Sequence, residues 1–135
     1  MRGLKDEIDS SILLVTHDLA VAAQVADRIA VMYSGKLAEI GSTREVLERP
    51  LHPYTSALIS SIPRPDPSKR TEVVPITGEV PSSMSPPPGC RFNPRCPYAE
   101  GVCRQEEPAL KEVLPAHWTA CHFSEDFLKE PLPMG

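Results

Sequence analysis

The first 49 residues of this 135-residue chain contain no proline, and all 16 prolines lie from Pro50 onward. Proline removes a backbone donor and fixes φ, so only the N-terminal part is expected to form continuous helices and strands. No apolar run is long enough to cross a bilayer, and the N-terminus lacks the apolar segment of a signal peptide. The net charge of −4 argues against a nucleic-acid partner. We therefore expect a cytoplasmic protein whose membrane association, if any, runs through partners.

The proline distribution and the 41% hydrophobic content predict one modest core and a second, loop-dominated part. We divide the chain into the end of an α/β domain (1–62), a proline-rich linker (63–80), a four-cysteine extension (81–123) and a disordered tail (124–135). The expected fold class is α/β, with a parallel-sheet strand, a helix, a β-hairpin and short helices, followed by a small Pro/Cys-rich extension.

The N-terminal part contains the patterns on which this fold class rests. Residues 12–15 are continuously apolar, which is typical of a strand buried on both faces of a parallel sheet. The helix after them places Leu19, Ala22 and Ala26 on one face. Residues 29–33 and 37–40 predict a hairpin around the turn Ser34-Gly35-Lys36.

Two short helices are expected after the hairpin. Ser42 and Glu45 have the spacing of a capping box, which predicts a helix that ends before Pro50. Pro53 suits the first position of the next helix, which should end before Pro63.

His17 is the candidate catalytic residue, in the sequence Thr16-His17-Asp18 between the apolar strand and the helix. Ligands of open α/β sheets bind at the carboxyl ends of strands, and helix N-termini favour anions. Taken alone, the residue is more readily interpreted as a capping or surface histidine, and the order of the surrounding elements favours the functional interpretation.

The order of these elements resembles the last quarter of ABC-transporter ATPase domains. The segments that carry the resemblance are Thr16-His17-Asp18, Ala26-Asp27-Arg28-Ile29 and Gly35-Lys36-Leu37. Two narrower phrases, His52-Pro53-Tyr54-Thr55 and the segment from Gly89 to Pro97, resemble the oligopeptide/dipeptide importer branch. The resemblance extends from residue 4 to about residue 123.

This resemblance implies that the parent protein is an ATP-hydrolysing subunit of an importer for peptides or nickel complexes. ATP and magnesium would be bound by the full-length parent, and His17 would be the switch histidine that contacts the γ-phosphate. The implied partners are a second ATPase subunit and transmembrane permease subunits, at the cytoplasmic face of the cell membrane. The chain contains no G-x-x-x-x-G-K-[ST] phosphate loop, so we expect no ATPase activity from it in isolation.

Four cysteines, Cys90, Cys96, Cys103 and Cys121, lie in the proline-rich part with the spacing C-x5-C-x6-C-x17-C. A reducing cytoplasm disfavours disulfides, and zinc sites usually contain the C-x2-C pair that is missing here. Four thiolates are the usual ligands of an iron–sulfur cube, and the neighbouring Arg91, Arg95 and Arg104 would compensate their charge. Zinc, disulfides, unrelated thiols and merely solvated arginines remain the alternatives. The importer resemblance likewise implies a [4Fe–4S] cluster on these cysteines.

Two histidines near Cys121 and two aromatic residues are further candidates for the predicted site. His117 and His122 are expected at the surface, with replacement of a cysteine ligand as the alternative, and Phe92 and Trp118 are expected to pack around the cluster. A rival to the importer interpretation is an independent metal-binding interaction module without an ATPase role. A nucleic-acid-binding zinc module is disfavoured by the acidic balance.

Overall fold

The computed structural model describes residues 11–62, 75–82 and 84–134. Its helices are α2 (Leu19–Val25), α3 (Thr43–Glu48), α4 (Pro53–Ser60), α5 (Gly101–Gln105) and α6 (Asp126–Lys129), and its strands are β1 (Arg28–Tyr33), β2 (Lys36–Ser42), β3 (Lys111–Leu114) and β4 (His117–Thr119). None of the helices in these ranges combines the length and apolar character needed to span a bilayer. Most of the linker predicted over 63–80 lies outside the described residues.

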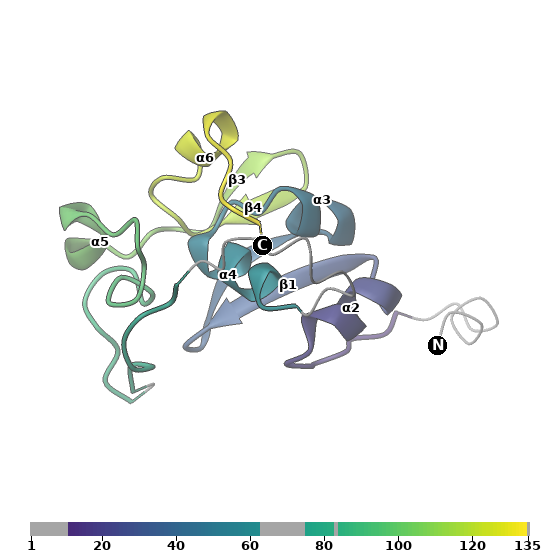
Figure 1. Ribbon diagram of the computed structural model, residues 1–135, viewed down its shortest axis with the longest axis horizontal. Helices are drawn as coiled ribbons and strands as arrows, with labels where there is room; N and C mark the ends of the chain where they lie inside the picture. The colour runs from purple at the N-terminus through teal and green to yellow at the C-terminus, as the bar shows by residue number, and fades with distance from the viewer. Residues whose placement is uncertain (1–10, 63–74, 83, 135) are drawn as a thin grey trace.

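Strands β1 and β2 form the predicted hairpin (Figure 1). Ser34 and Gly35 both have positive φ angles, of 46° and 78°, as expected of a two-residue hairpin turn. Along β1 the side chains alternate, so that Ile29, Val31 and Tyr33 are buried and their neighbours are exposed. The hairpin prediction is confirmed because both the apolar alternation and the turn chemistry are local.

The capping box predicted at the start of α3 is also formed. The backbone N–H of Glu45 donates to Ser42 Oγ at 3.2 Å, and Ser42 Oγ donates to Glu45 Oε2 at 2.7 Å. Helix α4 begins at Pro53, as predicted, with His52 as its N-cap. Side chains from the hairpin and α3 form the first core, which contains Ile29, Val31, Ala38 and Val46.

The extension is part of the same sheet as the hairpin. The strand order is β1-β2-β4-β3, and each neighbouring pair is antiparallel. Residues of β4 pair with residues of β2 about 80 positions earlier, with Glu39 opposite Thr119 and Ile40 opposite Trp118. The prediction of a loop-dominated extension therefore underestimates its regular structure, because the extension contains β3 and β4. Its two strands are short, and the long-range pairing with β2 that completes them is invisible to a local pattern.

The strand predicted at 12–15 is not formed. These residues are described but belong to no strand, and Leu13 and Val15 are 91% and 88% exposed. A buried parallel strand requires hydrogen-bonding neighbours and covered faces. The four-stranded sheet of the described chain is antiparallel and provides neither for residues 12–15. The parallel-sheet part of the predicted fold is thus wrong for this structure, and the α/β character is confirmed in its coarser form.

The C-terminal segment differs from the predicted disordered tail. Helix α6 forms within it, and Phe127 and Leu132 are buried against Leu51 in a second core. Arg49 Nη2 donates to the carbonyl oxygen of Leu128 at 2.9 Å, which ties this segment to the end of α3. The two apolar side chains supply enough buried surface to order a proline-rich segment that has little regular structure of its own.

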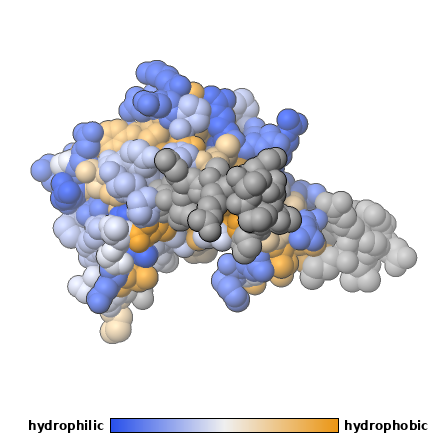
Figure 2. Space-filling view, viewed as in Figure 1, coloured by the Kyte–Doolittle hydropathy of each residue, from blue (hydrophilic) through white to orange (hydrophobic). Residues whose placement is uncertain are grey.

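Figure 2 shows one face of the molecule, on which apolar surface is not gathered into one belt. Figure 2 shows hydrophobic surface on this face as separate patches between hydrophilic ones. Such scattered exposure is ordinary for a small protein.

Candidate functional site

His17 lies in the exposed segment immediately before α2. The next residue, Asp18, is the N-cap of this helix, and its Oδ1 accepts hydrogen bonds from the backbone N–H groups of Ala20 and Val21 at 2.9 and 3.1 Å. The structure therefore places the helix where the sequence predicts it, but without the preceding strand. His17 is solvent-accessible, and its role as a switch histidine stays a prediction.

The four cysteines come from separate elements and line one small pocket. Cys90 and Cys96 lie in loops, Cys103 is in α5, and Cys121 follows β4. All four are free thiols, so the structure contains none of the disulfides considered as an alternative for these four cysteines. One pocket is thus lined by four cysteines that span 32 positions of sequence, and their role as cluster ligands stays a prediction.

Gly89 allows two of the cysteine segments to come together. The backbone N–H of Cys90 donates to the carbonyl oxygen of Cys103 at 2.8 Å. Gly89 has a φ of +73°, and a Cβ at this position would clash with the same Cys103 oxygen. Only glycine tolerates both this conformation and this close approach.

Burial strongly affects the thiols. It raises the pKa of Cys96 to about 11 and that of Cys121 to about 12, and it also raises the pKa of Cys90. The neighbouring cysteines raise these pKa values further, because each thiolate would repel the others. The thiols of Cys90, Cys96 and Cys121 are therefore neutral at physiological pH unless a bound cation stabilises their deprotonated form.

Backbone amides counteract part of this effect. Hydrogen bonds from the backbone N–H groups of Phe92, Tyr98 and Phe123 lower the pKa values of Cys90, Cys96 and Cys121, respectively. In each case the donor lies two residues after the cysteine. This repeated arrangement provides N–H donors to sulfur, which is the type of outer contact that tunes thiolate ligands.

The arginines do not have the role predicted for them. Arg91 Nη1 donates to the carbonyl oxygen of Ser34, and Arg95 Nη1 donates to the hydroxyl of Tyr33 at 3.4 Å. Arg104 is exposed. Two of the three guanidinium groups therefore bind the hairpin turn region rather than the sulfurs, because carbonyl and hydroxyl oxygens are better acceptors for N–H groups than thiols.

The two aromatic residues assigned to the site have different positions. Phe92 is buried, lines the cysteine pocket, and packs against the rings of Tyr33 and Tyr54 with centroid separations of 5.1 and 5.4 Å. Trp118 is not among the residues that line this pocket, and the guanidinium of Arg28 lies 5.6 Å from its ring. The assignment of Trp118 to the cluster environment is wrong because its side chain projects from the sheet beside Arg28.

The two histidines near Cys121 also differ. His122 lines the pocket, and its Nε2 donates to the carbonyl oxygen of Glu106 at 2.9 Å. His117 is fully buried in β4, and its Nε2 lies 2.6 Å from Glu39 Oε1. The expectation of a surface position is therefore wrong for His117, because its ring is covered where it lies over Gly41 and contacts the buried Glu39.

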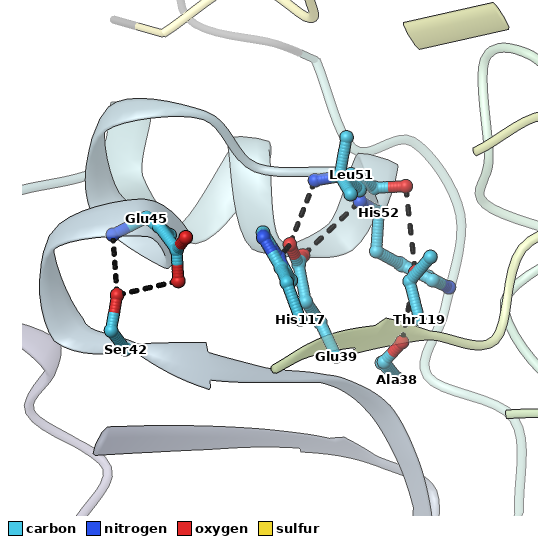
Figure 3. Close-up of polar contacts among 8 residues, drawn as sticks. All are labelled: Ala38, Glu39, Ser42, Glu45, Leu51, His52, His117 and Thr119. Carbon is cyan, nitrogen blue, oxygen red and sulfur yellow. Dashed lines mark hydrogen bonds and ion pairs between the residues drawn. The ribbon is translucent and has the colours of Figure 1, made fainter. Parts of the chain in front are cut away.

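Glu39 is a central polar residue that sequence reasoning missed. Its buried carboxylate also accepts hydrogen bonds from the backbone N–H groups of Leu51 and His52 at 2.8 and 3.1 Å (Figure 3). One side chain therefore joins the hairpin, the start of α4 and the extension. No local signal distinguishes Glu39 from an exposed residue of a hairpin, since its partners lie 12, 13 and 78 positions away.

The four cysteines of the pocket are, by residue type, suitable ligands for a metal ion or an iron–sulfur cluster. Four cysteines line one pocket, and three of them receive backbone N–H donors. No group of three or more His, Cys, Asp or Glu side chains in the described ranges is already arranged to hold a single metal ion. The residues thus fit such a group by type, and their side chains would have to adjust to bind it.

Comparison with known proteins identifies the region to which these residues belong. Residues 38–103 match the family model described as the oligopeptide/dipeptide transporter, C-terminal region. The chain carries the C-terminal region of this transporter family. The resemblance found in the sequence is thereby confirmed.

Individual transporter proteins agree with the family match. The chain is 45% identical over 121 residues to a putative peptide import ATP-binding protein of Brucella ovis, and 43% identical over 124 residues to the oligopeptide transport ATP-binding protein AppF of Bacillus subtilis. It is 43% identical over 121 residues to the dipeptide transport ATP-binding protein DppF of Haemophilus influenzae. Each alignment covers 90% of this chain but only 37–38% of the relative. The chain therefore spans less than two fifths of the length of these transporter proteins.

The transporter family match includes β2 from Ala38 onward, α3, α4 and the first three cysteines. His17 and Cys121 lie outside the matched interval, on opposite sides of it. The family model thus covers the junction between the hairpin and the extension, where Glu39 and His52 also lie.

Proposed function

We propose that this chain is the C-terminal segment of the ATP-hydrolysing subunit of an ABC importer for peptides or nickel complexes. The observation that carries the proposal is the extended similarity to ATP-binding proteins named for peptide, oligopeptide and dipeptide transport. In this proposal the segment works with a second ATPase subunit and with permease subunits at the cytoplasmic face of the membrane.

His17 is the residue proposed to act in ATP hydrolysis. An imidazole donor at the γ-phosphate would stabilise charge on the transferring phosphoryl group and orient the attacking water. Its exposed position before α2 leaves it accessible to a nucleotide held by other parts of the parent protein. ATP and magnesium would be bound there, and the isolated chain would not hydrolyse ATP.

The test is ATP hydrolysis by the full-length parent subunit carrying His17→Ala. We expect a loss of about 10²-fold in kcat, which is typical for removal of one transition-state donor. Asp18→Ala is the matched control, because it removes the N-cap of α2 but keeps the imidazole. Equal hydrolysis by His17→Ala and the unaltered subunit would contradict the role of His17 and leave the assignment to the importer family intact.

The extension is proposed to bind a [4Fe–4S] cluster through Cys90, Cys96, Cys103 and Cys121, with zinc as the alternative. Support comes from the shared pocket, the free thiols and the amide donors to three of the sulfurs. When bound, the cluster would supply a cross-link between segments that bury little apolar surface, as structural metals do in small domains. The chain's own residues hold this pocket against the hairpin through Phe92.

Serine substitution of each cysteine tests this module. We expect each of the four single Cys→Ser variants to lose most of the visible absorbance of the anaerobically purified chain, since all four sulfurs are required. Ser124→Ala is a control that removes a hydroxyl near Cys121. Full absorbance in every cysteine variant would contradict the ligand assignment.

The alternative function is an independent metal-binding module without an ATPase role. The shared four-stranded sheet favours it in one respect, because the hairpin and extension then have a core of their own. It predicts that replacement of His17 leaves the parent's ATPase activity unchanged and that removal of the extension's cysteines does not affect transport.

A further inference from the structure

His52 connects the hairpin region to the cysteine pocket. It is the N-cap of α4, and only 3% of its surface is exposed. Its backbone N–H donates to Glu39 Oε2 at 3.1 Å, while the residue lines both the pocket formed by the four cysteines and the larger neighbouring pocket that includes Lys36 and Glu107. Figure 3 shows the ring extending away from the Glu39–His117 pair. The main chain and side chain of this residue therefore serve two different parts of the molecule.

The hydrogen bond at Nδ1 defines which ring nitrogen carries the proton. The backbone N–H of Tyr54 donates to His52 Nδ1 at 3.1 Å, so Nδ1 is the acceptor and Nε2 bears the hydrogen. Burial also lowers the pKa of His52 to about 4, which keeps the ring neutral under physiological conditions. His52 thus has one fixed tautomer, with an N–H donor at Nε2.

Two other polar side chains that line the pocket, Asn93 and His122, already use their donors elsewhere, whereas the hydroxyl of Tyr98 is a second donor at the pocket. Asn93 Nδ2 donates to the carbonyl oxygens of Pro88 and Cys90, each at 2.8 Å. His122 Nε2 donates to the carbonyl oxygen of Glu106. Within the described part of the chain, the hydrogen bond of the His52 ring is made at Nδ1, so Nε2–H is available to a further acceptor.

We infer that Nε2–H of His52 is a preset hydrogen-bond donor to sulfur in the four-cysteine pocket, and that His52 positions and tunes the cluster proposed to bind there. The inference rests on the proposed function, since sulfur accepts most strongly as a thiolate or cluster sulfide. A donor to such sulfur withdraws negative charge and favours the reduced cluster, so its loss should make the reduction potential more negative. His52 is a positioning residue in this arrangement and not a ligand.

Two variants separate the roles of the two ring nitrogens. His52→Asn places an amide oxygen near the position of Nδ1, and asparagine is a favourable N-cap, but the side chain is too short to donate from the position of Nε2. His52→Gln extends an amide donor toward the position of Nε2 and gives up the cap. His122→Asn is the matched control from the same pocket, because the donor it removes is already bound to Glu106.

The experiment measures the midpoint potential and the rate of cluster loss in air for the reconstituted 135-residue chain. We expect His52→Asn to have a more negative potential and several-fold faster cluster loss, His52→Gln to remain close to the unaltered chain, and His122→Asn to leave the potential unchanged. Thermal unfolding of each metal-free variant reports separately on the cap. If His52 had a purely structural role, the variants would differ in thermal unfolding, but His52→Asn and His52→Gln would not differ in midpoint potential.

The possible failures are distinguishable. If the unaltered chain binds iron and sulfide but His52→Asn has the same potential, or His52→Gln shifts as much as His52→Asn, the inference about Nε2 is overturned and the cluster proposal stands. If the unaltered chain binds no iron and sulfide, both the cluster proposal and the inference are overturned.

Discussion

The hairpin region and the cysteine-bearing extension are stabilised over very different sequence distances. In the hairpin, β1 and β2 are joined by a two-residue turn, and α3 is capped by residues three positions apart. In the extension, β4 pairs with β2, and Arg49 donates to the carbonyl oxygen of Leu128 79 positions later. Local interactions stabilise the hairpin region, whereas the extension is stabilised by contacts with the hairpin region. The extension should therefore be lost first when contacts between the two are removed.

The largest effect is expected from Glu39→Ala, which removes a buried carboxylate shared by both regions. His117 and the two amides at the start of α4 would lose their acceptor, and breaking a buried pair costs about 3–5 kcal/mol of unfolding free energy. Urea denaturation measures this loss. Glu48→Ala is the matched control, because Glu48 forms an exposed pair with Arg44 and its removal should change stability little. Equal stability of the two variants would contradict the central role of Glu39.

A second change tests the C-terminal segment. Phe127→Ala should destabilise the chain by about 3 kcal/mol, because Phe127 is buried with Leu51 and Leu132 and packs edge-on against Tyr98. The measurement is thermal unfolding, with Met134→Ala as an exposed control from the same segment. If Phe127→Ala unfolds like the control, the segment contributes no core and the tail is disordered after all.

Gly89→Ala tests the close approach between the Cys90 and Cys103 segments. A left-handed φ and a Cβ contact with a backbone oxygen should together cost about 2 kcal/mol. Gly101→Ala is the control, because a Cβ there would have no neighbour within 4 Å. Chemical denaturation compares the two variants, and a neutral Gly89→Ala would show that the two segments do not meet as described.

The smallest effect is expected from a cap within the hairpin region. Ser42→Ala should cost about 1 kcal/mol, because the Glu45 amide loses its acceptor at the start of α3. Ser42→Asn should retain most of the stability, since asparagine is also a good N-cap. Thermal unfolding that ranks Ser42→Asn below Ser42→Ala would argue against the capping interaction.

These differences in range explain what could be predicted from the sequence. The hairpin, the Ser42 cap and the Pro53 helix start each depend on residues a few positions apart, and all three are confirmed. The strand at 12–15 was wrong because an apolar run predicts burial only where a partner covers it. The ordered tail and the shared sheet escaped prediction because Phe127 and β4 are placed by contacts with distant residues.

The candidate site follows the same pattern. The spacing of the cysteines indicated a common site, and the structure brings them to one pocket. The arginines nearest in sequence proved to bind the hairpin, while His52, 38 positions before Cys90, lines the pocket. Proximity in sequence is therefore a poor guide to the surroundings of a site assembled from loops.

The most direct test of this account is iron, sulfide and zinc analysis of the anaerobically purified 135-residue chain. We expect about four iron and four sulfide per chain, together with broad visible absorbance, because four cysteines that share a pocket match the ligand set of one cube. One zinc per chain without iron or colour would replace the cluster by the zinc alternative. Four free thiols with neither iron nor zinc would contradict the claim that the cysteine pocket is a metal site.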